Sequence, residues 1–222
     1  MYFISAFDVI GPNMIGPSSS HTAGAVAMAL LAGKLFQRPV KKVRFTLYGS
    51  FSKTYRGHGT DLALVGGILG FSTDDVRIKE AFVIAKKRGL QYTFVPDEKT
   101  HTRHPNTVDI LMEDEQGYSM QVTGESTGGG KIRIICINGI DVDFTGEYST
   151  LIVKQNDKPG VVAHITQCLS HHNVNIAFMR LFRESKGSTA YTVVESDEKI
   201  PQKILDEING NDQIHETMLI QA

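Results

Sequence analysis

The chain has 222 residues, a formal net charge of −1 and only two cysteines, and these numbers exclude several classes of protein. Nucleic-acid binding rests on many contacts from Lys and Arg to phosphates, so a near-neutral chain is not expected to bind nucleic acid. The longest strongly apolar run, Ala23 to Leu31, is far shorter than the roughly 20 residues that span a bilayer. The first twelve residues, MYFISAFDVIGP, lack a basic region and carry Asp8, so we expect no signal peptide.

The two cysteines, Cys136 and Cys168, are not in a CxxC arrangement. This predicts no disulfide framework and a cytoplasmic location. Two thiolates cannot supply a Cys₄ zinc site or an iron–sulfur cluster from this chain alone. Both cysteines fall on apolar faces of predicted elements, which favours buried structural thiols.

The first part of the chain predicts a mixture of helices and antiparallel strands. Met28, Leu31 and Leu35 have helical spacing, and Pro39 ends the pattern. Further helices are expected over 61–69 and 74–87, and strands over 43–47, 108–112, 118–122, 132–136 and 140–144. Asn138-Gly139 is typical of a two-residue hairpin turn. The pattern indicates an α+β domain.

The tail of the chain predicts a second, smaller domain. A strand over 150–156 leads into a helix opened by Asp157-Lys158-Pro159-Gly160. Strands over 174–182 and 189–195, a helix around 204–208 and a strand over 214–220 follow. This βαββαβ order predicts a ferredoxin-like layer of two helices on an antiparallel sheet. We therefore expect domains at 1–147 and 148–222.

The densest polar segment, GPSSSHTAG at 16–24, lies where the first helix begins. Unpaired backbone N–H groups and the helix dipole at such a place favour an anion such as a carboxylate or phosphate. The alternative is a simple helix cap, for which one serine suffices, or a solvated loop.

A second polar segment comprises GSFSKT at 49–54 and RGHGTD at 56–61, between a strand and a helix. His58 lies between glycines, and an accessible imidazole can act as a general acid or base near neutral pH. The alternative is a glycine-rich turn in which Thr60 or Asp61 caps the helix.

Three further segments leave alternatives open. HTRHPNT at 101–107 carries two histidines with no third metal ligand in register, which favours a polar surface loop. STGGGK at 126–131 lacks the order of a nucleotide-binding loop and suits an interface or a lid equally well. In the tail, residues 156–160 and Asn175 suit a small amino-acid site, or a strand–helix turn with Pro159 at the first helical position.

Taken together, GPSSSHTAG (16–24), GSFSKTYRGHGTD (49–61), HTRHPNT (101–107) and STGGGKIRI (126–134) resemble the small, or beta, subunit of bacterial iron–sulfur-dependent L-serine dehydratase. The tail, with its strand–NDKPG–helix opening, resembles an ACT domain. The resemblance covers essentially the whole chain. It implies a mixed α/β serine-dehydratase beta-chain domain followed by a ferredoxin-like ACT domain.

The resemblance also implies an activity and partners. Enzymes of this family convert L-serine to pyruvate and ammonia, a step in amino-acid degradation and gluconeogenesis. They use a [4Fe–4S] cluster, held by cysteines of the alpha subunit, in which one iron acts as a Lewis acid on the substrate hydroxyl. A monovalent cation such as K⁺ is a further expected cofactor. The expected partners are the alpha subunit, L-serine and a second copy through the ACT domain, with no membrane.

Carried over by motif, His58 is the leading catalytic acid–base candidate, and His21 is the second catalytic candidate. The expected substrate-binding residues are Ser18, Ser19, Ser20, His21, Thr22, Gly59, Thr60, Asp61, His104 and Asn106. The expected ACT ligand site comprises Asn156, Gly160, Val161 and Asn175. An alternative is a non-catalytic regulatory module that senses serine or an anion, because the first domain also resembles an effector-binding domain of some D-3-phosphoglycerate dehydrogenases.

Overall fold

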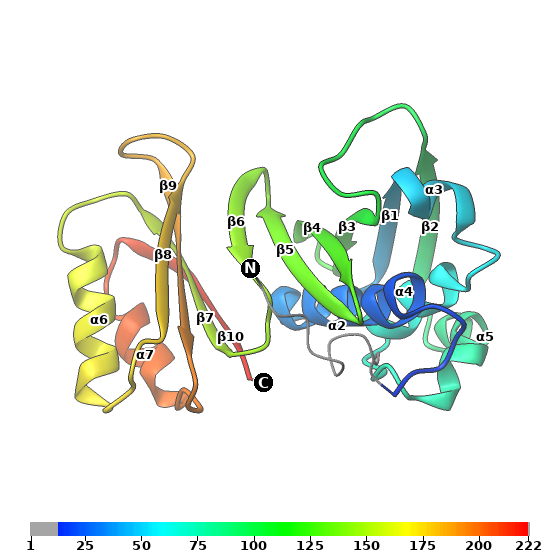
Figure 1. Ribbon diagram of the computed structural model, residues 1–222. Helices are drawn as coiled ribbons and strands as arrows, with labels where there is room; N and C mark the ends of the chain where they lie inside the picture. Colours follow the sequence, from blue (N-terminus) through cyan, green and yellow to red (C-terminus); the bar gives the residue numbers. More distant parts are fainter. Residues whose placement is uncertain (1–12, 222) are drawn as a thin grey trace, which may run out of the picture. The chain divides into compact units, whose positions relative to one another are not determined.

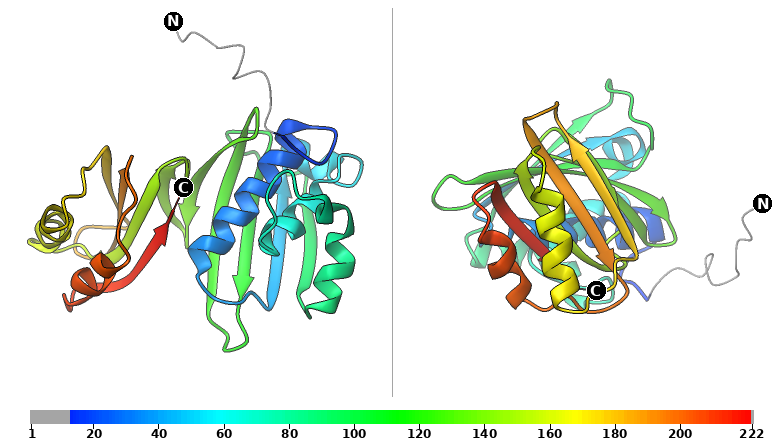
Figure 2. Two further views of the ribbon diagram at one scale, coloured as in Figure 1. Left: turned by 90° about the horizontal axis from the view of Figure 1, so that it is seen from below. Right: turned by 90° about the vertical axis from the view of Figure 1, so that its left-hand side faces the viewer.

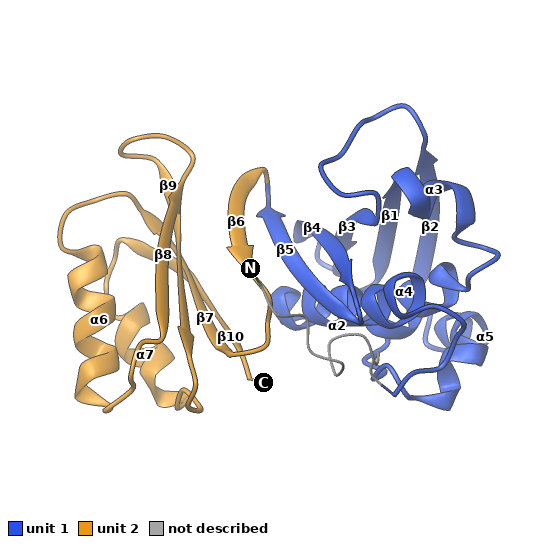
Figure 3. Ribbon diagram, viewed as in Figure 1, with its two compact units in different colours: residues 1–138 blue, residues 139–222 orange. Residues whose placement is uncertain are grey.

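The computed structural model describes residues 13–221, so the twelve N-terminal residues discussed above lie outside the described part (Figure 1). The chain forms two compact units, Met1–Asn138 and Gly139–Ala222, which meet in the sequence at the Asn138-Gly139 turn (Figure 3). Both turn residues have positive φ, 50° and 81°, as the expected two-residue turn requires. The expected domain boundary at 147/148 stays a prediction.

Unit 1 combines a mixed sheet with helices. Its elements are a π-helical turn η1 (Ser19–Ala23), α2 (Gly24–Phe36), β1 (Lys42–Tyr48), α3 (Gly49–Thr54), α4 (Thr60–Ile68), a 3₁₀ turn η2 (Val76–Glu80), α5 (Ala81–Lys87), β2 (Gln91–Asp97), β3 (Thr107–Glu113), β4 (Ser119–Gly128) and β5 (Lys131–Ile137). The strands lie in the order β2-β1-β3-β4-β5. Strands β1 and β2 are parallel, and the other neighbours are antiparallel.

The core of unit 1 lies between the sheet and the helix pair α2 and α4, which Figure 2 shows on one face of the strands. Val43, Phe45 and Leu47 alternate inward from β1, as their period of two predicts. The two helices approach closely at Gly67, where a Cβ would lie 2.5 Å from the carbonyl oxygen of Val26. This close packing holds the last turn of α4 against the first half of α2.

Three elements of unit 1 differ from the sequence expectation. The single helix expected over 74–87 is divided into η2 and α5, because Asp75 caps a tight turn that buries Ile78. Strand β2 and the short helix α3 were not anticipated. Strand β2 is an edge strand with no fully buried residue, and it contains Pro96, which argues against a strand when the sequence is considered alone.

Unit 2 contains β6 (Ile140–Phe144), β7 (Ser149–Asn156), α6 (Val161–His171), β8 (Phe178–Arg183), β9 (Thr189–Ser196), α7 (Lys203–Asn209) and β10 (Ile214–Ile220). From β7 to β10 the order is the predicted βαββαβ, and the antiparallel sheet runs β10-β7-β9-β8. Both helices pack on one face of this sheet (Figures 1 and 2). The apolar core between them includes Leu151, Ile165 and Ile204. The ferredoxin-like prediction is confirmed.

Two details of unit 2 correct the sequence expectation. Pro159 is not the first helical residue, since α6 begins at Val161 after Gly160 in the left-handed region. The strand expected from Val174 begins only at Phe178. Across residues 13–221, we find no helix with the length and apolar character needed to cross a membrane.

Candidate active site

The serine-rich segment forms the π-helical turn η1 rather than an ordinary first helical turn. Ser18 caps it, because its hydroxyl accepts the backbone N–H of His21 at 3.2 Å. The N–H of Gly24 reaches back five residues to the carbonyl oxygen of Ser19, which widens the turn. Insertions of this kind occur often at functional sites. Here the turn points His21 inward, where only 9% of the residue is exposed.

Both ring nitrogens of His21 contact hydroxyl groups. Nδ1 lies 3.0 Å from Ser20 Oγ, and Nε2 lies 2.9 Å from Ser50 Oγ at the start of α3. The ring also meets Phe51 edge-on, with centroids 5.2 Å apart. Burial, and then the nearby imidazole of His58, lower the pKa of His21 below its usual range. His21 is therefore neutral at pH 7, so one ring nitrogen donates and the other accepts.

His58 stands beside His21 in the turn between α3 and α4. The two rings are perpendicular, with centroids 4.8 Å apart. The carbonyl oxygen of His58 accepts the hydroxyl of Thr22 at 3.2 Å, which ties this turn to η1. His58 Nδ1 is buried and has no hydrogen-bond partner within residues 13–221. Such a nitrogen can exchange a proton with a bound molecule.

The turn after His58 is shaped by Gly59, whose φ of 69° lies in the left-handed region that favours glycine. Gly59 is the N-cap of α4, so neither Thr60 nor Asp61 caps this helix. Thr60 is fully buried, and its hydroxyl lacks a partner in the described chain. The carboxylate of Asp61 accepts the N–H of Leu62 at 2.8 Å, and burial raises the pKa of Asp61.

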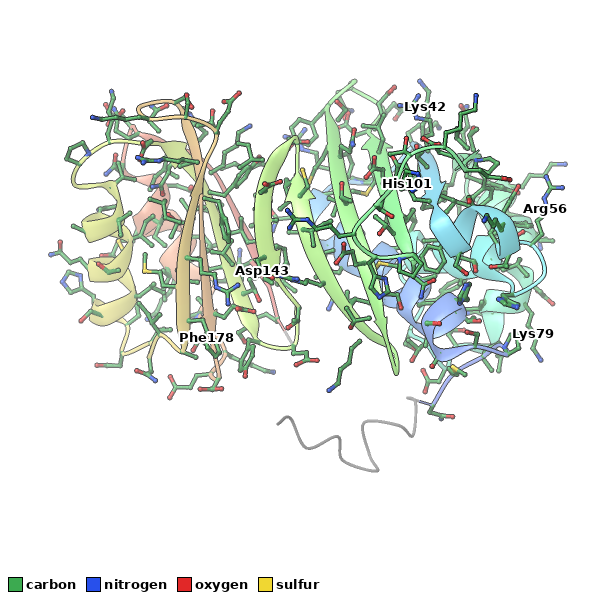
Figure 4. All side chains as sticks on the ribbon, turned by 45° about the horizontal axis from the view of Figure 1, so that its top comes forward. Lys42, Arg56, Lys79, His101, Asp143 and Phe178 are labelled. Carbon is green, nitrogen blue, oxygen red and sulfur yellow. The ribbon has the colours of Figure 1, made fainter. Side chains whose placement is uncertain are left out.

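The loop before β3 joins the same region. Pro105 accepts the backbone N–H of Ser50 through its carbonyl oxygen at 2.7 Å. His104 Nδ1 accepts the N–H of Asn106 at 3.2 Å, which holds the loop in shape. Asn106 is buried, and its side-chain oxygen is unpartnered in the part of the chain that the structure describes. His101 is exposed on the same loop (Figure 4), so the two histidines take different roles.

The structure thus brings three separate motifs to one place. Direct contacts connect Ser18, Ser20, His21, Thr22 and His58. Ser19 takes part through its carbonyl oxygen. The contact between Ser50 and His21, and that between Phe51 and His21, were not anticipated. The motif at 49–54 predicted a ligand-binding turn, but no local sequence pattern shows that Ser50, rather than a neighbouring residue, contacts His21.

Ser126 is a further neighbour of this region that was not anticipated. It is completely buried on β4, and its N–H donates to the carbonyl oxygen of Asn106 at 3.0 Å. Its hydroxyl packs against Gly24, where a side chain would clash with it. Gly24 is therefore needed for the close approach of η1 and β4.

The expected ACT site residues do not meet within one copy of unit 2. Gly160 precedes α6, Val161 begins it and is buried, and Asn175 follows its far end. An eleven-residue helix is about 16 Å long, so α6 separates Gly160 from Asn175. The side chain of Asn156 already binds Gln213 at 3.1 Å and His215 at 2.9 Å. A ligand at these four residues stays a prediction.

The donor groups of this chain do not fit an iron–sulfur cluster. Cys136 belongs to β5 of unit 1, and Cys168 is buried in the core of unit 2. Burial raises the pKa of Cys168, which disfavours its thiolate. No group of three or more His, Cys, Asp or Glu side chains within residues 13–221 is arranged to hold a metal ion.

Comparison with known families identifies both parts of the chain. The serine dehydratase beta chain family matches residues 5–134, and the ACT domain family matches residues 149–212. The chain belongs to the serine dehydratase beta chain family and carries an ACT domain.

Three relatives extend the comparison. The chain is 42% identical to a probable L-serine dehydratase beta chain of Bacillus subtilis, over 94% of both chains. It is 41% identical to the L-serine dehydratase beta chain of Peptoniphilus asaccharolyticus, over 93% of both. It is also 25% identical to a D-3-phosphoglycerate dehydrogenase of Bacillus subtilis, over 86% of this chain but only 36% of that protein.

Proposed function

We propose that this chain is the beta subunit of an L-serine dehydratase and that, with an alpha subunit, it converts L-serine to pyruvate and ammonia. Two relatives with this name match almost the full chain. The observation that carries the proposal is the buried Nδ1 of His58, without a partner in the described chain, beside the neutral ring of His21 and the serine-rich turn.

Different residues of this chain are suited to the Cα proton and to the carboxylate of L-serine. Loss of the Cα proton and of the β-hydroxyl as water gives an enamine, which hydrolyses to pyruvate and ammonia. His58 Nδ1 is the candidate acceptor of the Cα proton. The hydroxyls of Ser18 and Ser20, with the backbone N–H groups at the start of η1, are suited to bind the substrate carboxylate.

The alpha subunit completes the site in this proposal. The two cysteines here do not fit a [4Fe–4S] cluster, so we assign the cluster to the alpha subunit and derive no step through it. A monovalent cation such as K⁺ and a cytoplasmic location also remain part of the proposal. A purified pair of chains assayed for iron, sulfide and K⁺ dependence tests these assignments together.

The main test is activity of the two chains assembled anaerobically. We expect His58→Ala to lower the rate of pyruvate formation by about 10²–10⁴-fold, the usual range for a general base. Ser18→Ala removes the hydroxyl that caps η1 and should weaken substrate binding. His101→Ala is the matched control, because His101 is an exposed histidine on the loop before β3. Full activity of His58→Ala would refute its assignment, and inactivity of the wild-type assembly would refute the proposed function.

We also propose that two copies pair through unit 2. Strand β8 is an edge of its sheet, and Phe178 and Leu181 on it are 47% and 45% exposed (Figure 4 labels Phe178). Edge strands with apolar side chains pair readily with another strand. Leu181→Arg should convert a dimer to a monomer in sedimentation analysis. Val76→Arg, at a more exposed valine of unit 1, is the control and should leave the mass unchanged.

The alternative function is a regulatory module without catalysis, which senses serine or an anion. The similarity to a D-3-phosphoglycerate dehydrogenase favours it, because the match covers only about a third of that enzyme. Calorimetry of the chain with L-serine separates the two functions. Binding lost in Asn175→Ala, with no activity in any assembly, supports the sensor. Activity that requires His58 supports the enzyme.

A further inference from the structure

We infer that Ser50 is a positioning residue: its hydroxyl fixes the imidazole of His21, so that His21 orders the serine-rich turn while His58 Nδ1 remains available to the substrate. The inference deepens the proposed function and rests on it for its kinetic consequence. Its structural part, the dependence of the His21 ring on Ser50, stands on contacts within unit 1 alone.

The contacts of His21 indicate an orienting role. A hydroxyl lies within 3.0 Å of each ring nitrogen, Ser20 at Nδ1 and Ser50 at Nε2. A neutral imidazole held at both ends has its tautomer and ring rotation set by those partners. For His21 to take up a proton, the hydroxyl facing its accepting nitrogen must turn away. His58 Nδ1 has no such partner among the described residues.

Ser50 is itself held by the surrounding backbone. Gly49 has a φ of 53°, and a Cβ there would lie 2.6 Å from the carbonyl oxygen of Pro105. The N–H of Ser50 donates to that same oxygen at 2.7 Å, and its carbonyl oxygen accepts the hydroxyl of Thr54 at 2.8 Å. The loop before β3 therefore fixes Ser50, which in turn contacts His21. A functional group supported in this way is preorganised.

The next residue strengthens the same arrangement. Phe51 is fully buried and meets the His21 ring edge-on, so the first turn of α3 supplies both a hydrogen-bond partner and a packing surface. Phe51 restrains the position of the His21 ring, but it does not determine which ring nitrogen carries the proton. Of Ser50 and Phe51, only Ser50 forms a hydrogen bond with Nε2 of His21.

Ser52 provides a matched control in the same helix. It is buried, and its hydroxyl donates to the carbonyl oxygen of Gly49 at 2.8 Å rather than to His21. Ser50→Ala and Ser52→Ala each remove one hydroxyl and one hydrogen bond from α3. A general loss of helix stability would affect both variants, whereas loss of His21 positioning would affect only the first.

The first measurement uses nitrogen NMR of the full chain, with the His21 ring signals assigned by their absence in His21→Ala. We expect Ser50→Ala to shift the Nε2 signal of His21 and to change its titration with pH. Ser52→Ala should leave both as in the wild type. Unchanged His21 signals in Ser50→Ala, or equal changes in the two variants, would overturn the inference. This measurement needs no catalytic activity.

The second measurement is steady-state kinetics of the assembled two-chain enzyme. We expect Ser50→Ala to lower kcat about tenfold while KM changes less than about twofold, because orientation rather than substrate binding is lost. Ser50→Thr, which keeps a hydroxyl, should recover most of the rate. A kcat of Ser50→Ala within about twofold of wild type, or an equal loss in Ser52→Ala, contradicts the role. If the wild-type assembly forms no pyruvate, the proposed function fails and the NMR result alone decides the role of Ser50.

Discussion

The two units differ in what they bury. Unit 1 holds four buried side-chain atoms without a partner within residues 13–221, on His58, Thr60, Asn106 and Ser126, whereas unit 2 holds one, on Glu195. Folded proteins satisfy most buried polar groups, and exceptions gather where function needs them. Both units have an apolar core between a sheet and helices, but unit 1 adds these unpartnered polar groups. The contrast favours unit 1 as the place of the proposed binding chemistry.

Charge divides the chain in the same way. Residues 1–138 carry 16 Lys and Arg against 12 Asp and Glu, a net charge of +4. Residues 139–222 carry 7 against 12, a net charge of −5. The near-neutral total therefore conceals a basic unit, whose field favours an anionic group such as a substrate carboxylate.

The strongest expected effect on stability tests the core of unit 2. Ile165→Ala removes a fully buried side chain from α6 and should lower the free energy of unfolding by about 3 kcal/mol. Urea unfolding of the full chain measures the loss. Gln167→Ala, at an exposed position of α6, should change it by less than about 0.5 kcal/mol. Unchanged NMR signals of the His21 ring in Ile165→Ala would support separate roles of the two units. Altered signals would show that the core of unit 2 affects the site in unit 1.

The next largest effect tests the packing behind the site in unit 1. Gly67→Ala places a methyl group against the backbone of Val26 and should destabilise the chain by about 2 kcal/mol. Gly33→Ala, in the last turn of α2 where a Cβ would meet no other atom within 4 Å, should instead stabilise it by up to about 1 kcal/mol. Thermal unfolding compares the two variants. Equal effects would mean that the α2–α4 contact does not hold unit 1 together.

A smaller effect concerns pH and His21. Its pKa in the folded chain lies below the usual 6.5, so the unfolded chain takes up a proton first as the pH falls. The contribution of His21 to stability is complete above pH 6.5 and is lost as the pH falls from there towards the folded pKa. Unfolding free energies measured between pH 8 and pH 5 should show this loss, and His21→Gln should remove it. An identical pH profile for the variant would contradict the burial of a neutral His21.

Glu195 gives unit 2 the opposite pH response, with the smallest expected effect. Burial raises the pKa of Glu195, with Arg180 opposing the shift and Asp143 and Glu147 adding to it. The contribution of protonated Glu195 to the free energy of unfolding is fully present below the usual pKa of 4.5. It is lost as the pH rises through the raised pKa of the folded chain. Glu195→Gln should therefore stabilise the chain at pH 7 and have little effect at pH 4. A stabilisation that is independent of pH would show that the carboxylate is not the cause.

The helices and strands of unit 2 were predicted from the sequence more completely than those of unit 1, for a physical reason. Strand β10 and helix α7 follow the expected ranges because their apolar residues alternate or recur toward one core. The division of 74–87 was missed because the capping of Asp75 and the burial of Ile78 compete with a continuous helix. In the candidate site, the motifs were recognised, but their contacts join residues far apart in sequence, as with His21 and Ser50.

The sequence by itself determined the two-part organisation, the βαββαβ tail and the motifs that carry the family resemblance, because periodicity and turn residues report local hydrogen bonding and burial. Only the tertiary structure decided that the serine-rich segment forms a π turn, that His21 is held between Ser20 and Ser50, and that His58 keeps an unpartnered nitrogen beside it in the described chain. These features depend on how the first turn of α3, the loop before β3 and the start of α2 pack together, which no local pattern contains.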